Sequence, residues 1–368
     1  MLIQYDHQVF SLQNAGGASR YHYELIRYLR NVRDVQTELV IGLNGSVLPF
    51  EEFSAPETRV WGMKSHIRPG KGRYIANELL GNGVALCRGK VDVYHPTLYR
   101  NMPLVRARRR VVTHHDCAHE RYPEFFSSVK RIVSAKQKQF AGADAIICVS
   151  ESSRRDLHEF YEVDPLKVRV IHHGLTPLAR NAAACAYLKK RMRREFLLFV
   201  GSRAVYKNFP ILLKAFHESG VDRSFDLLVL GGGAITRAEC ELAAKLGLTN
   251  SLIAEADADD ALLAEAYAAA RLFVYPSLYE GFGFPPLEAM ACGCPVLASN
   301  SSSIPEISCD APSYFDPRDL TALCAALHKA TTDEEARKHA VERGLSVAAQ
   351  YSWDKCGRET LALYRECQ

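Results

Sequence analysis

The segment EGFGFPPLE carries two carboxylates, Glu280 and Glu288, on either side of a glycine turn. Its two glycines permit a tight turn that exposes backbone amides, and its two prolines suit the first turn of a helix. Unpaired amides at the start of a helix lie at the positive end of its dipole and favour a bound phosphate. Carboxylates do not hold phosphate, so the expected partners of Glu280 and Glu288 are hydroxyl groups. The sequence therefore predicts a sugar-nucleotide site whose turn consists of Gly281, Phe282, Gly283 and Phe284.

Two cations, Arg203 and Lys207, follow the apolar run at residues 196–200. If that run is a strand, both side chains lie at the carboxyl edge of a sheet, where α/β proteins bind ligands. Two cations at such an edge indicate a polyanion, although the same pair can also be surface charges on a loop. Placed opposite the glycine turn, they would form a diphosphate clamp, in which arginine binds two oxygens and lysine acts as a point charge.

A glycine pair, Gly16 and Gly17, comes between the first apolar run and a helical pattern. Such a loop can approach a phosphate closely because glycine has no side chain. The G-x-G-x-x-G spacing of dinucleotide sites is absent, so the pair taken alone could equally be a simple turn. Both glycines are therefore candidates for the nucleotide-sugar site.

The segment THHDCAHE places His115 and Asp116 just after another apolar run, at residues 110–113. A zinc site would need four well-placed ligands, and no second cluster with a recognised spacing completes the set. We therefore predict no metal. Instead, His115 is expected to lie near the transferred sugar or the acceptor, with Asp116 orienting that histidine or a neighbouring loop.

These residues can form one site only if the fold places the ends of their strands close together. Short apolar runs alternate with helix-like stretches throughout the chain, which is the pattern of repeated β-α units and a parallel sheet. The first expected series of strands covers residues 2–5, 37–41, 91–94, 110–113, 145–149 and 168–171. The second covers residues 196–200, 227–230, 252–254, 272–275 and 295–298. The fold class is therefore α/β with two parallel sheets.

The length of 368 residues favours two domains over one. A turn-like HHGLTP precedes a basic helical stretch, which places the boundary near residue 175. We expect domains at residues 1–175 and 176–350, followed by a C-terminal helix within residues 351–368. Two facing sheets would form one cleft between them, beyond the carboxyl ends of their strands.

The composition is that of an ordinary globular protein with a formal net charge of only +4, which argues against nucleic acid as a partner. Basic residues cluster at 106–110 and 189–194, either as solvated faces or as contacts with anionic lipid. The cysteines are odd in number and lack a C-x-x-C pair, which is typical of a reducing compartment. No secretory signal or apolar stretch of about 18 residues is visible. We expect a cytoplasmic protein, with peripheral membrane contact as an option.

Taken together, these motifs resemble the retaining glycosyltransferases of family 4, over nearly the whole chain. The likeness rests on the GG loop, on THHD, ADAIICVSESSRRDL, VIHHG and VGSRAVYKN, and above all on EGFGFPPLEAM with its glutamates eight positions apart. The resemblance implies the GT-B architecture, in which two Rossmann-like domains face a cleft. The first domain would bind the acceptor, the second the nucleotide sugar, and the last helix would cross back to the first domain.

By the same resemblance, Arg203 and Lys207 would hold the diphosphate, Glu288 the ribose hydroxyls and Glu280 the hydroxyls of the donor sugar, while His115 would approach that sugar. The HHG that follows residue 171 departs from the family's more usual asparagine-glycine, which leaves the role of that position open. YHPTLYR and HERYPEFF look most like members that build bacterial surface polysaccharides such as lipopolysaccharide, often mannosyltransferases. This likeness implies GDP-mannose as the donor, with a UDP-sugar as second choice, and a glycan or lipid-linked oligosaccharide as acceptor.

Three other functions compete with sugar transfer. A retaining glycoside hydrolase needs carboxyl groups about 5 to 5.5 Å apart, whereas eight helical positions between Glu280 and Glu288 would span about 12 Å. A nucleotide-sugar epimerase could use the same cleft and the same donor, and the serine-rich SNSSSIPEI would suit either enzyme. A non-catalytic binding module would bind the donor without releasing a nucleoside diphosphate. The set of charged residues expected in the cleft favours a retaining hexosyltransferase that needs no metal, in which the diphosphate oxygen takes the acceptor proton.

Overall fold

The computed structural model describes residues 1–14, 16–53, 58–65, 67, 70–99 and 104–367. The chain divides into two compact units. The first comprises Met1–Gly174 together with Ser352–Gln368, and the second comprises Leu175–Tyr351. Each unit is built on its own parallel sheet with helices against it, so the α/β fold expected from the alternating pattern is confirmed.

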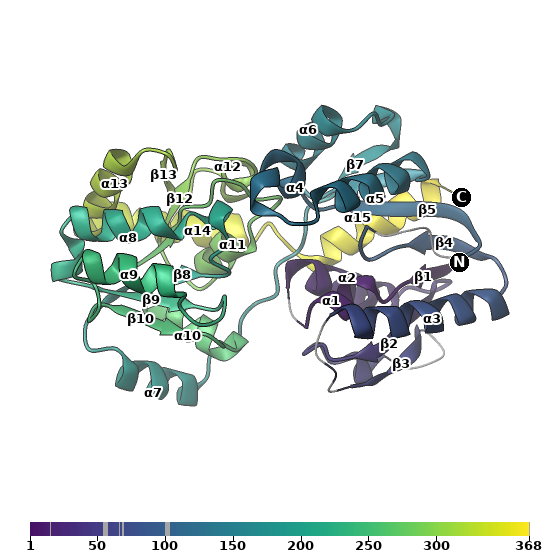
Figure 1. The fold of residues 1–368 in the computed structure, drawn as a ribbon, viewed down its shortest axis with the longest axis horizontal. Coiled ribbons are helices and arrows are strands. Elements are labelled where there is room, and N and C mark those ends of the chain that lie inside the picture. Colours follow the sequence, from purple (N-terminus) through teal and green to yellow (C-terminus); the bar gives the residue numbers. More distant parts are fainter. Residues whose placement is uncertain (15, 54–57, 66, 68–69, 100–103, 368) are drawn as a thin grey trace. The chain divides into compact units, whose positions relative to one another are not determined.

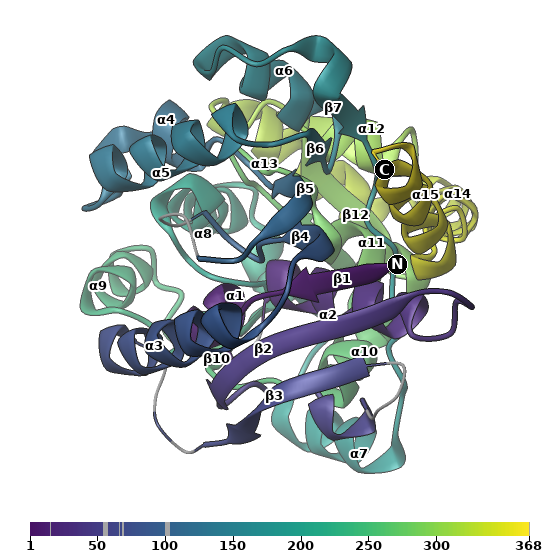
Figure 2. The ribbon, with the colours of Figure 1, turned by 90° about the vertical axis from the view of Figure 1, so that its right-hand side faces the viewer.

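The sheet of the first unit has seven parallel strands in the order β3-β2-β1-β4-β5-β6-β7. Their bounds are Leu2–Tyr5 (β1), Gln36–Asn44 (β2), Thr58–Lys64 (β3), Val91–His95 (β4), Ala107–His114 (β5), Ala145–Cys148 (β6) and Val168–Val170 (β7). The strand order reverses beside β1, so loops on either side of that strand diverge at its carboxyl end. Figure 2 shows the strands of this sheet one above another, from β3 at the bottom to β7 at the top.

The helices of the first unit are α1 (Gln8–Leu12), α2 (Gly17–Leu29), α3 (Lys71–Cys87), α4 (Ala118–Arg121), α5 (Val129–Ala141), α6 (Glu151–Phe160) and α15 (Trp353–Glu366). The last of these, α15, packs against α2 although more than 300 residues separate them. Gly357 makes this close approach possible, because a Cβ there would lie 2.3 Å from the ring of Tyr28. The Tyr364 hydroxyl contacts the Tyr5 hydroxyl at 2.9 Å, which fixes the far end of the helix.

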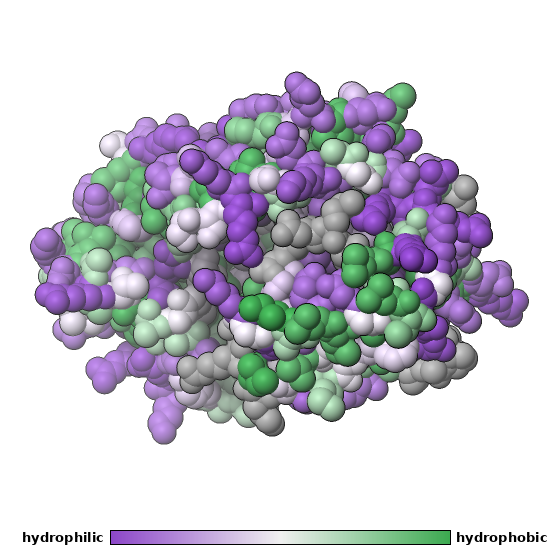
Figure 3. Space-filling view, turned by 45° about the vertical axis from the view of Figure 1, so that its right-hand side comes forward, coloured by the Kyte–Doolittle hydropathy of each residue, from purple (hydrophilic) through white to green (hydrophobic). Residues whose placement is uncertain are grey.

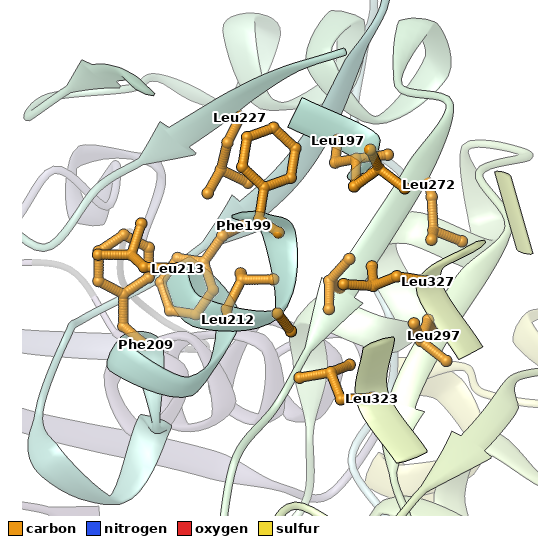
Figure 4. Close-up of a cluster of buried hydrophobic side chains, with 14 of the residues drawn as sticks. Leu197, Phe199, Phe209, Leu212, Leu213, Leu227, Leu272, Leu297, Leu323 and Leu327 are labelled. Atoms are coloured by element: carbon orange, nitrogen blue, oxygen red, sulfur yellow. The ribbon is translucent and has the colours of Figure 1, made fainter. Parts of the chain in front are cut away.

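The second unit contains six parallel strands in the order β10-β9-β8-β11-β12-β13. The strands are β8 (Phe196–Val200), β9 (Asp226–Leu230), β10 (Leu252–Glu255), β11 (Leu272–Tyr275), β12 (Val296–Ser299) and β13 (Ser313–Phe315). The helices are α7 (Ala182–Arg191), α8 (Phe209–Glu218), α9 (Arg237–Lys245), α10 (Asp260–Ala269), α11 (Phe284–Ala291), α12 (Ile304–Ser308), α13 (Leu320–Thr332) and α14 (Glu334–Ala348). Figure 4 shows leucines and phenylalanines of β8, α8 and α13 forming the core on one face of this sheet.

All eleven expected strands are present, and their bounds agree to within a few residues. Two strands, β3 and β13, were missed, and each of them lies at the edge of a sheet. Most residues of β3 are exposed or half-buried, so it lacks the continuous apolar run that marks a central strand. With only three residues, β13 is too short for any alternation to be visible.

Candidate functional site

The glycine turn of the second unit connects the end of β11 to the start of α11. Gly283 is the residue before the helix, and its φ of 106° lies in the left-handed region that glycine adopts without steric cost. The helix then begins with Phe284 and two prolines, which need no amide partner in the first turn. The turn thus delivers Glu280 before the helix and Glu288 within it.

Two serines hold the turn in shape. The amide of Glu280 donates to Ser302 Oγ at 2.8 Å. Ser303 Oγ donates to the carbonyls of both Glu280 and Phe282 at 2.9 Å. Ser303 is fully buried, so these bonds are shielded from water. The serine-rich segment therefore orients the predicted sugar-binding carboxylate, a role that the sequence did not assign to it.

Lys207 and Glu280 form an ion pair at the carboxyl ends of β8 and β11. The ammonium lies 2.6 and 2.8 Å from the two oxygens of Glu280, and the Tyr275 hydroxyl is 3.3 Å away. Its charge also lies 5.5 Å from the ring centres of Tyr206 and Tyr275. Both members of the pair are mostly buried, so their attraction is less screened than that of a surface pair. The tertiary structure thus brings together two residues that the sequence placed 73 positions apart.

Glu288 receives a hydrogen bond from the Tyr267 hydroxyl at 3.3 Å. Burial, and next the nearby Glu288 charge, raises the pKa of Tyr267 well above its usual value. Burial and the Glu280 charge act in the same way on the pKa of Tyr275. Both phenols therefore stay protonated at neutral pH and present hydrogen-bond donors toward the two carboxylates. Neither tyrosine was predicted, because a tyrosine in a strand or helix pattern has no signal that separates it from the core.

The guanidinium of Arg203 is hydrogen-bonded to groups of the protein itself. Its Nε donates to Glu239 Oε1 at 3.0 Å. Its terminal nitrogens donate to four carbonyls of the loop after β9, at 2.7 to 3.3 Å from the oxygens of Gly231, Gly232, Gly233 and Ala234. The three glycines all have φ between +74° and +79°. The guanidinium therefore shapes this loop, and binding of a diphosphate by Arg203, which stays a prediction, would require it to exchange some of these bonds.

An Arg203→Lys variant is expected to loosen the loop at residues 231–234. An ammonium has three donors and no planar fork, so at least two of the five bonds are lost. At about 0.5–1.5 kcal/mol for each lost bond, the free energy of unfolding should fall by about 1–3 kcal/mol. Hydrogen exchange should report faster exchange in this loop. Glu239→Gln, which leaves the four carbonyl bonds in place, serves as the matched control; equal exchange rates in both variants would contradict the assignment.

The remaining predicted residues belong to the first unit. Gly16 and Gly17 are exposed at the start of α2, where Gly16 is extended and Gly17 is the first helical residue. A Cβ on Gly16 would lie 2.4 Å from Gln13 Oε1, the end of a flexible side chain that could move aside. The two glycines therefore present the amino end of a 13-residue helix at the carboxyl side of β1.

His115 follows β5 and lies half-buried among aromatic rings. Its backbone amide donates to the Tyr99 hydroxyl at 2.8 Å, and its ring is 5.8 Å from that of Tyr21 and 5.9 Å from that of His173. Burial lowers the pKa of His115 to about 4, against the smaller opposing effect of Asp116. The imidazole is therefore neutral at pH 7, which suits a hydrogen-bonding group rather than a fixed charge.

Asp116 organises its own loop. Its carboxylate accepts the Ala118 amide at 3.0 Å at the start of α4, and no hydrogen bond joins it to the His115 ring within the described residues. Burial would raise the pKa of Asp116, but the charge of Lys136 and the Ala118 amide lower it. The buried Lys136 ammonium donates to the Asp116 carbonyl at 2.7 Å and to Glu120 at 3.0 Å. Lys136 was not predicted, since it lies in the pattern of a surface helix.

Among the residues that the structure describes, no group of three or more histidine, cysteine, aspartate or glutamate side chains is placed to hold a metal ion. The described part of the chain likewise has no helix with the length and apolar character needed to cross a membrane.

Comparisons with known proteins agree with this arrangement. The family models Glycosyltransferase Family 4 and Glycosyl transferases group 1 match residues 15–177 and 186–347, respectively. The chain is 31% identical over 287 residues to O-antigen chain mannosyltransferase B of Escherichia coli, covering 74% of each protein. It is 29% identical over 233 residues to the serotype-specific mannosyltransferase WbdA of the same organism, covering 59% of this chain and 28% of the relative.

Solved structures share the fold at low sequence identity. Sucrose-phosphate synthase from Thermosynechococcus elongatus superposes with a TM-score of 0.77 at 20% identity, covering 99% of this chain and 98% of the other. Anabaena HepE, solved in complex with UDP and glucose, gives a TM-score of 0.76 at 16% identity and 98% coverage of both chains. WaaG, a glycosyltransferase involved in lipopolysaccharide biosynthesis, gives 0.72 at 17% identity, again with 98% coverage of both. These neighbours confirm the expected GT-B type of fold.

Proposed function

Because this chain belongs to glycosyltransferase family 4, we propose that it transfers mannose from a nucleoside diphosphate to a hydroxyl of a glycan or lipid-linked acceptor in surface-polysaccharide synthesis. The observation that carries the proposal is the pairing of Lys207 with Glu280 beside the glycine turn at the start of α11. It combines, in one unit, a cation for phosphate, a carboxylate for sugar hydroxyls and the positive end of a helix dipole.

GDP-mannose is the proposed donor, and a UDP-sugar is the second candidate. Support for mannose comes from the similarity to O-antigen chain mannosyltransferase B, which extends over three quarters of both proteins. Support for a UDP-sugar comes from the shared fold with HepE, whose structure contains UDP and glucose. We propose that Glu288 binds the ribose hydroxyls, that Gly16 and Gly17 approach the donor phosphates, and that no metal or other cofactor takes part.

In the proposed reaction, the bond between the anomeric carbon and the diphosphate oxygen breaks, and a bond from that carbon to the acceptor oxygen forms on the same face. The leaving diphosphate oxygen takes the proton of the acceptor hydroxyl. Negative charge on the diphosphate increases as the bond breaks, so donors fixed around it lower the barrier more than donors on the neutral sugar. Lys207 and the amides near Gly283 would supply this stabilisation.

Without a donor, the Lys207 charge is neutralised by Glu280. A bound diphosphate would offer the ammonium a second anionic partner, and Glu280 could then accept hydroxyls of the sugar. The pair would therefore link phosphate binding to sugar binding, since the same carboxylate serves both. His115, neutral at pH 7, would present a ring nitrogen to the sugar or to the acceptor from the first unit.

A screen of nucleoside diphosphates and their sugars tests the proposal by thermal stabilisation. A ligand at 100 times its Kd should stabilise the protein by about 2.7 kcal/mol, and GDP-mannose and GDP are expected to give the largest shifts. Stabilisation by uridine nucleotides alone would overturn the choice of donor. Labelled donor should then release GDP only when an acceptor glycan is present. An epimerised donor would favour the epimerase, and tight binding without release of a nucleoside diphosphate to any acceptor would favour a binding module.

We also propose that the protein works in the cytoplasm and can contact the inner face of the membrane. A lipid-linked acceptor would be held there, so an enzyme that meets the membrane surface would find its acceptor at high local concentration.

A further inference from the structure

Four arginines of the basic clusters that the sequence offered as lipid contacts form ion pairs with acidic neighbours. In the first cluster, Arg108 pairs with Asp92 and Arg109 with Asp144. In the second cluster, two of the three arginines are also paired, Arg191 with Glu255 and Arg194 with Asp226. These pairs reduce the net charge that the two runs offer to anionic head groups.

Helix α3 buries polar side chains and exposes apolar ones, which is the reverse of the usual pattern for a helix at the surface of a water-soluble unit. Beside Tyr74 and Ala85, its buried side holds the polar residues Arg73 and Asn77, which are each about 1% exposed. Arg73 donates to the carbonyls of Phe10 and Ser11, and Asn77 bonds the backbone of Leu43. The polar groups of α3 are thus satisfied inside the unit, which leaves its apolar residues to face outward.

The outward side of α3 is apolar over its whole length. The side chains of Ile75, Leu79, Leu80 and Leu86 are between 44% and 70% exposed. Ile75, Leu79 and Leu86 lie within about 40° of one another around the helix axis and span about 16 Å along it. The exposed residues from Gly72 to Cys87 are uncharged, and the one acidic residue of α3, Glu78, is half-buried and paired with His7. Figure 3 shows hydrophobic side chains gathered on this face.

Cations border the apolar side of α3 at both ends. Lys71 is exposed in the first turn, and Lys90 is exposed just beyond the last turn. No ion pair with either lysine is found in the described part of the chain, in contrast to the four paired arginines of the basic clusters. A row of exposed aliphatic side chains bordered by free ammonium groups is complementary to the anionic head groups and acyl chains at a bilayer surface.

We propose that the outward side of α3, defined by Ile75, Leu79, Leu80 and Leu86 with Lys71 and Lys90, docks on the surface of an anionic lipid bilayer. A second copy of the chain fits this surface less well. In an antiparallel pair of such helices, Lys71 of each copy would lie near Lys90 of the other, and in a parallel pair each lysine would meet its own counterpart. Like charges would therefore meet at both ends in either arrangement. Lipid phosphates, by contrast, would pair with both lysines at once.

Vesicle flotation with the full chain tests the proposal, without donor or acceptor present. Binding is expected to vesicles that contain phosphatidylglycerol, to weaken as salt is raised, and to be much weaker with phosphatidylcholine alone. The double variant Leu79→Ser/Leu86→Ser should reduce vesicle affinity about tenfold or more, because two aliphatic side chains no longer enter the interface. Lys71→Glu/Lys90→Glu should reduce binding to the anionic vesicles in particular.

Two matched controls distinguish this face from general stickiness. Leu166 of the first unit is 82% exposed but lies outside α3, so Leu166→Ser should leave flotation unchanged. Lys138→Glu, on the exposed side of α5, should likewise have little effect. Equal binding by the wild type and both α3 variants would overturn the proposal. The proposal would also be overturned if the wild type does not bind vesicles but forms a dimer, and if Leu79→Ser/Leu86→Ser abolishes that dimer.

The outcome is separable from that of the proposed reaction. All α3 variants should retain transfer to a water-soluble acceptor, because none of the substituted residues belongs to the candidate site. If transfer fails for the wild type as well, the proposed function is wrong while flotation still reports on α3. If the α3 variants lose flotation but still transfer sugar to the water-soluble acceptor, α3 is the docking surface and takes no part in the reaction itself.

Discussion

A Lys207→Ala variant is expected to lose most of its transfer activity while remaining folded. A hydrogen bond to a charged partner contributes about 1.5–3 kcal/mol, and in the proposed reaction Lys207 makes such a bond to the departing diphosphate. If that bond is strongest in the transition state, its loss should lower kcat/KM by roughly 10- to 150-fold. Steady-state transfer with the preferred donor, together with thermal unfolding, would measure both halves of this expectation.

The structure shows which control the Lys207 experiment needs. Removing the ammonium also leaves the mostly buried Glu280 carboxylate without its partner, which can destabilise the turn by itself. Lys207→Met keeps the aliphatic stem between Tyr206 and Tyr275, and Lys207→Met/Glu280→Gln also removes the unpaired charge. If Lys207 acts on the diphosphate, the double variant should regain stability without regaining activity. Near-normal turnover of any folded variant without the ammonium would contradict the proposed clamp.

The first unit is expected to lose stability steeply below about pH 6.5. Four buried or half-buried histidines lie close together there, with ring centres 5.3 to 6.2 Å apart along the series His95, His22, His115 and His173. Burial is the largest cause that lowers the pKa of each. Repulsion from a neighbouring histidine of this series adds to it for His22, His95 and His173.

The sign of the effect follows from where the protons bind. In the unfolded chain these histidines take up protons near pH 6.5, whereas in the folded chain the pKa of His115 is about 4 and that of His95 about 3. The unfolded state therefore binds more protons below pH 6.5, and stability falls as the pH falls through that value. Above pH 6.5 the contribution is fully present. Each histidine changes the free energy of unfolding by at most about 1.4 kcal/mol per pH unit. The four together therefore give a slope of several kcal/mol per pH unit.

Urea unfolding between pH 7.5 and 5.0 would measure this slope. Both tryptophans of the chain, Trp61 and Trp353, belong to the first unit, so their fluorescence reports on that unit alone. His22→Phe keeps an aromatic ring in the cluster and should reduce the slope by about one proton. His339→Gln, at an exposed position of the second unit, should leave it unchanged. A slope that is the same in all three proteins would rule out the cluster as its source.

The expected strands were found because their signal is local. A central strand of a parallel sheet is covered on both faces, so it must be apolar along its whole length, and this is visible in a run of five residues such as Phe196–Val200. The edge strands β3 and β13 do not need to be apolar along their whole length, and neither contains such a run. The signal for the glycine turn is also local, because only glycine takes the φ of Gly283 without strain.

The candidate site was predicted in its residue types but not in its contacts. The sequence indicated that Lys207, Glu280 and Glu288 follow strand ends, and parallel strands place such ends at one edge. It gave no sign that Lys207 would pair with Glu280, because an ion pair between residues 73 positions apart depends on the order of the strands in the sheet. Nor could it show that Arg203 spends its five donors on Glu239 and the glycine loop after β9.

By itself, the sequence determined the alternation of strands and helices, the conformation of the glycine turns and the identity of the charged residues near strand ends. Each of these follows from the steric and solvation preferences of a few neighbouring residues. Only the tertiary structure decided the partners of those charges, the burial of four histidines in one cluster, and the direction in which α3 turns its leucines. These depend on which distant segments pack together, and a charge or an apolar side chain acquires its role only from what surrounds it.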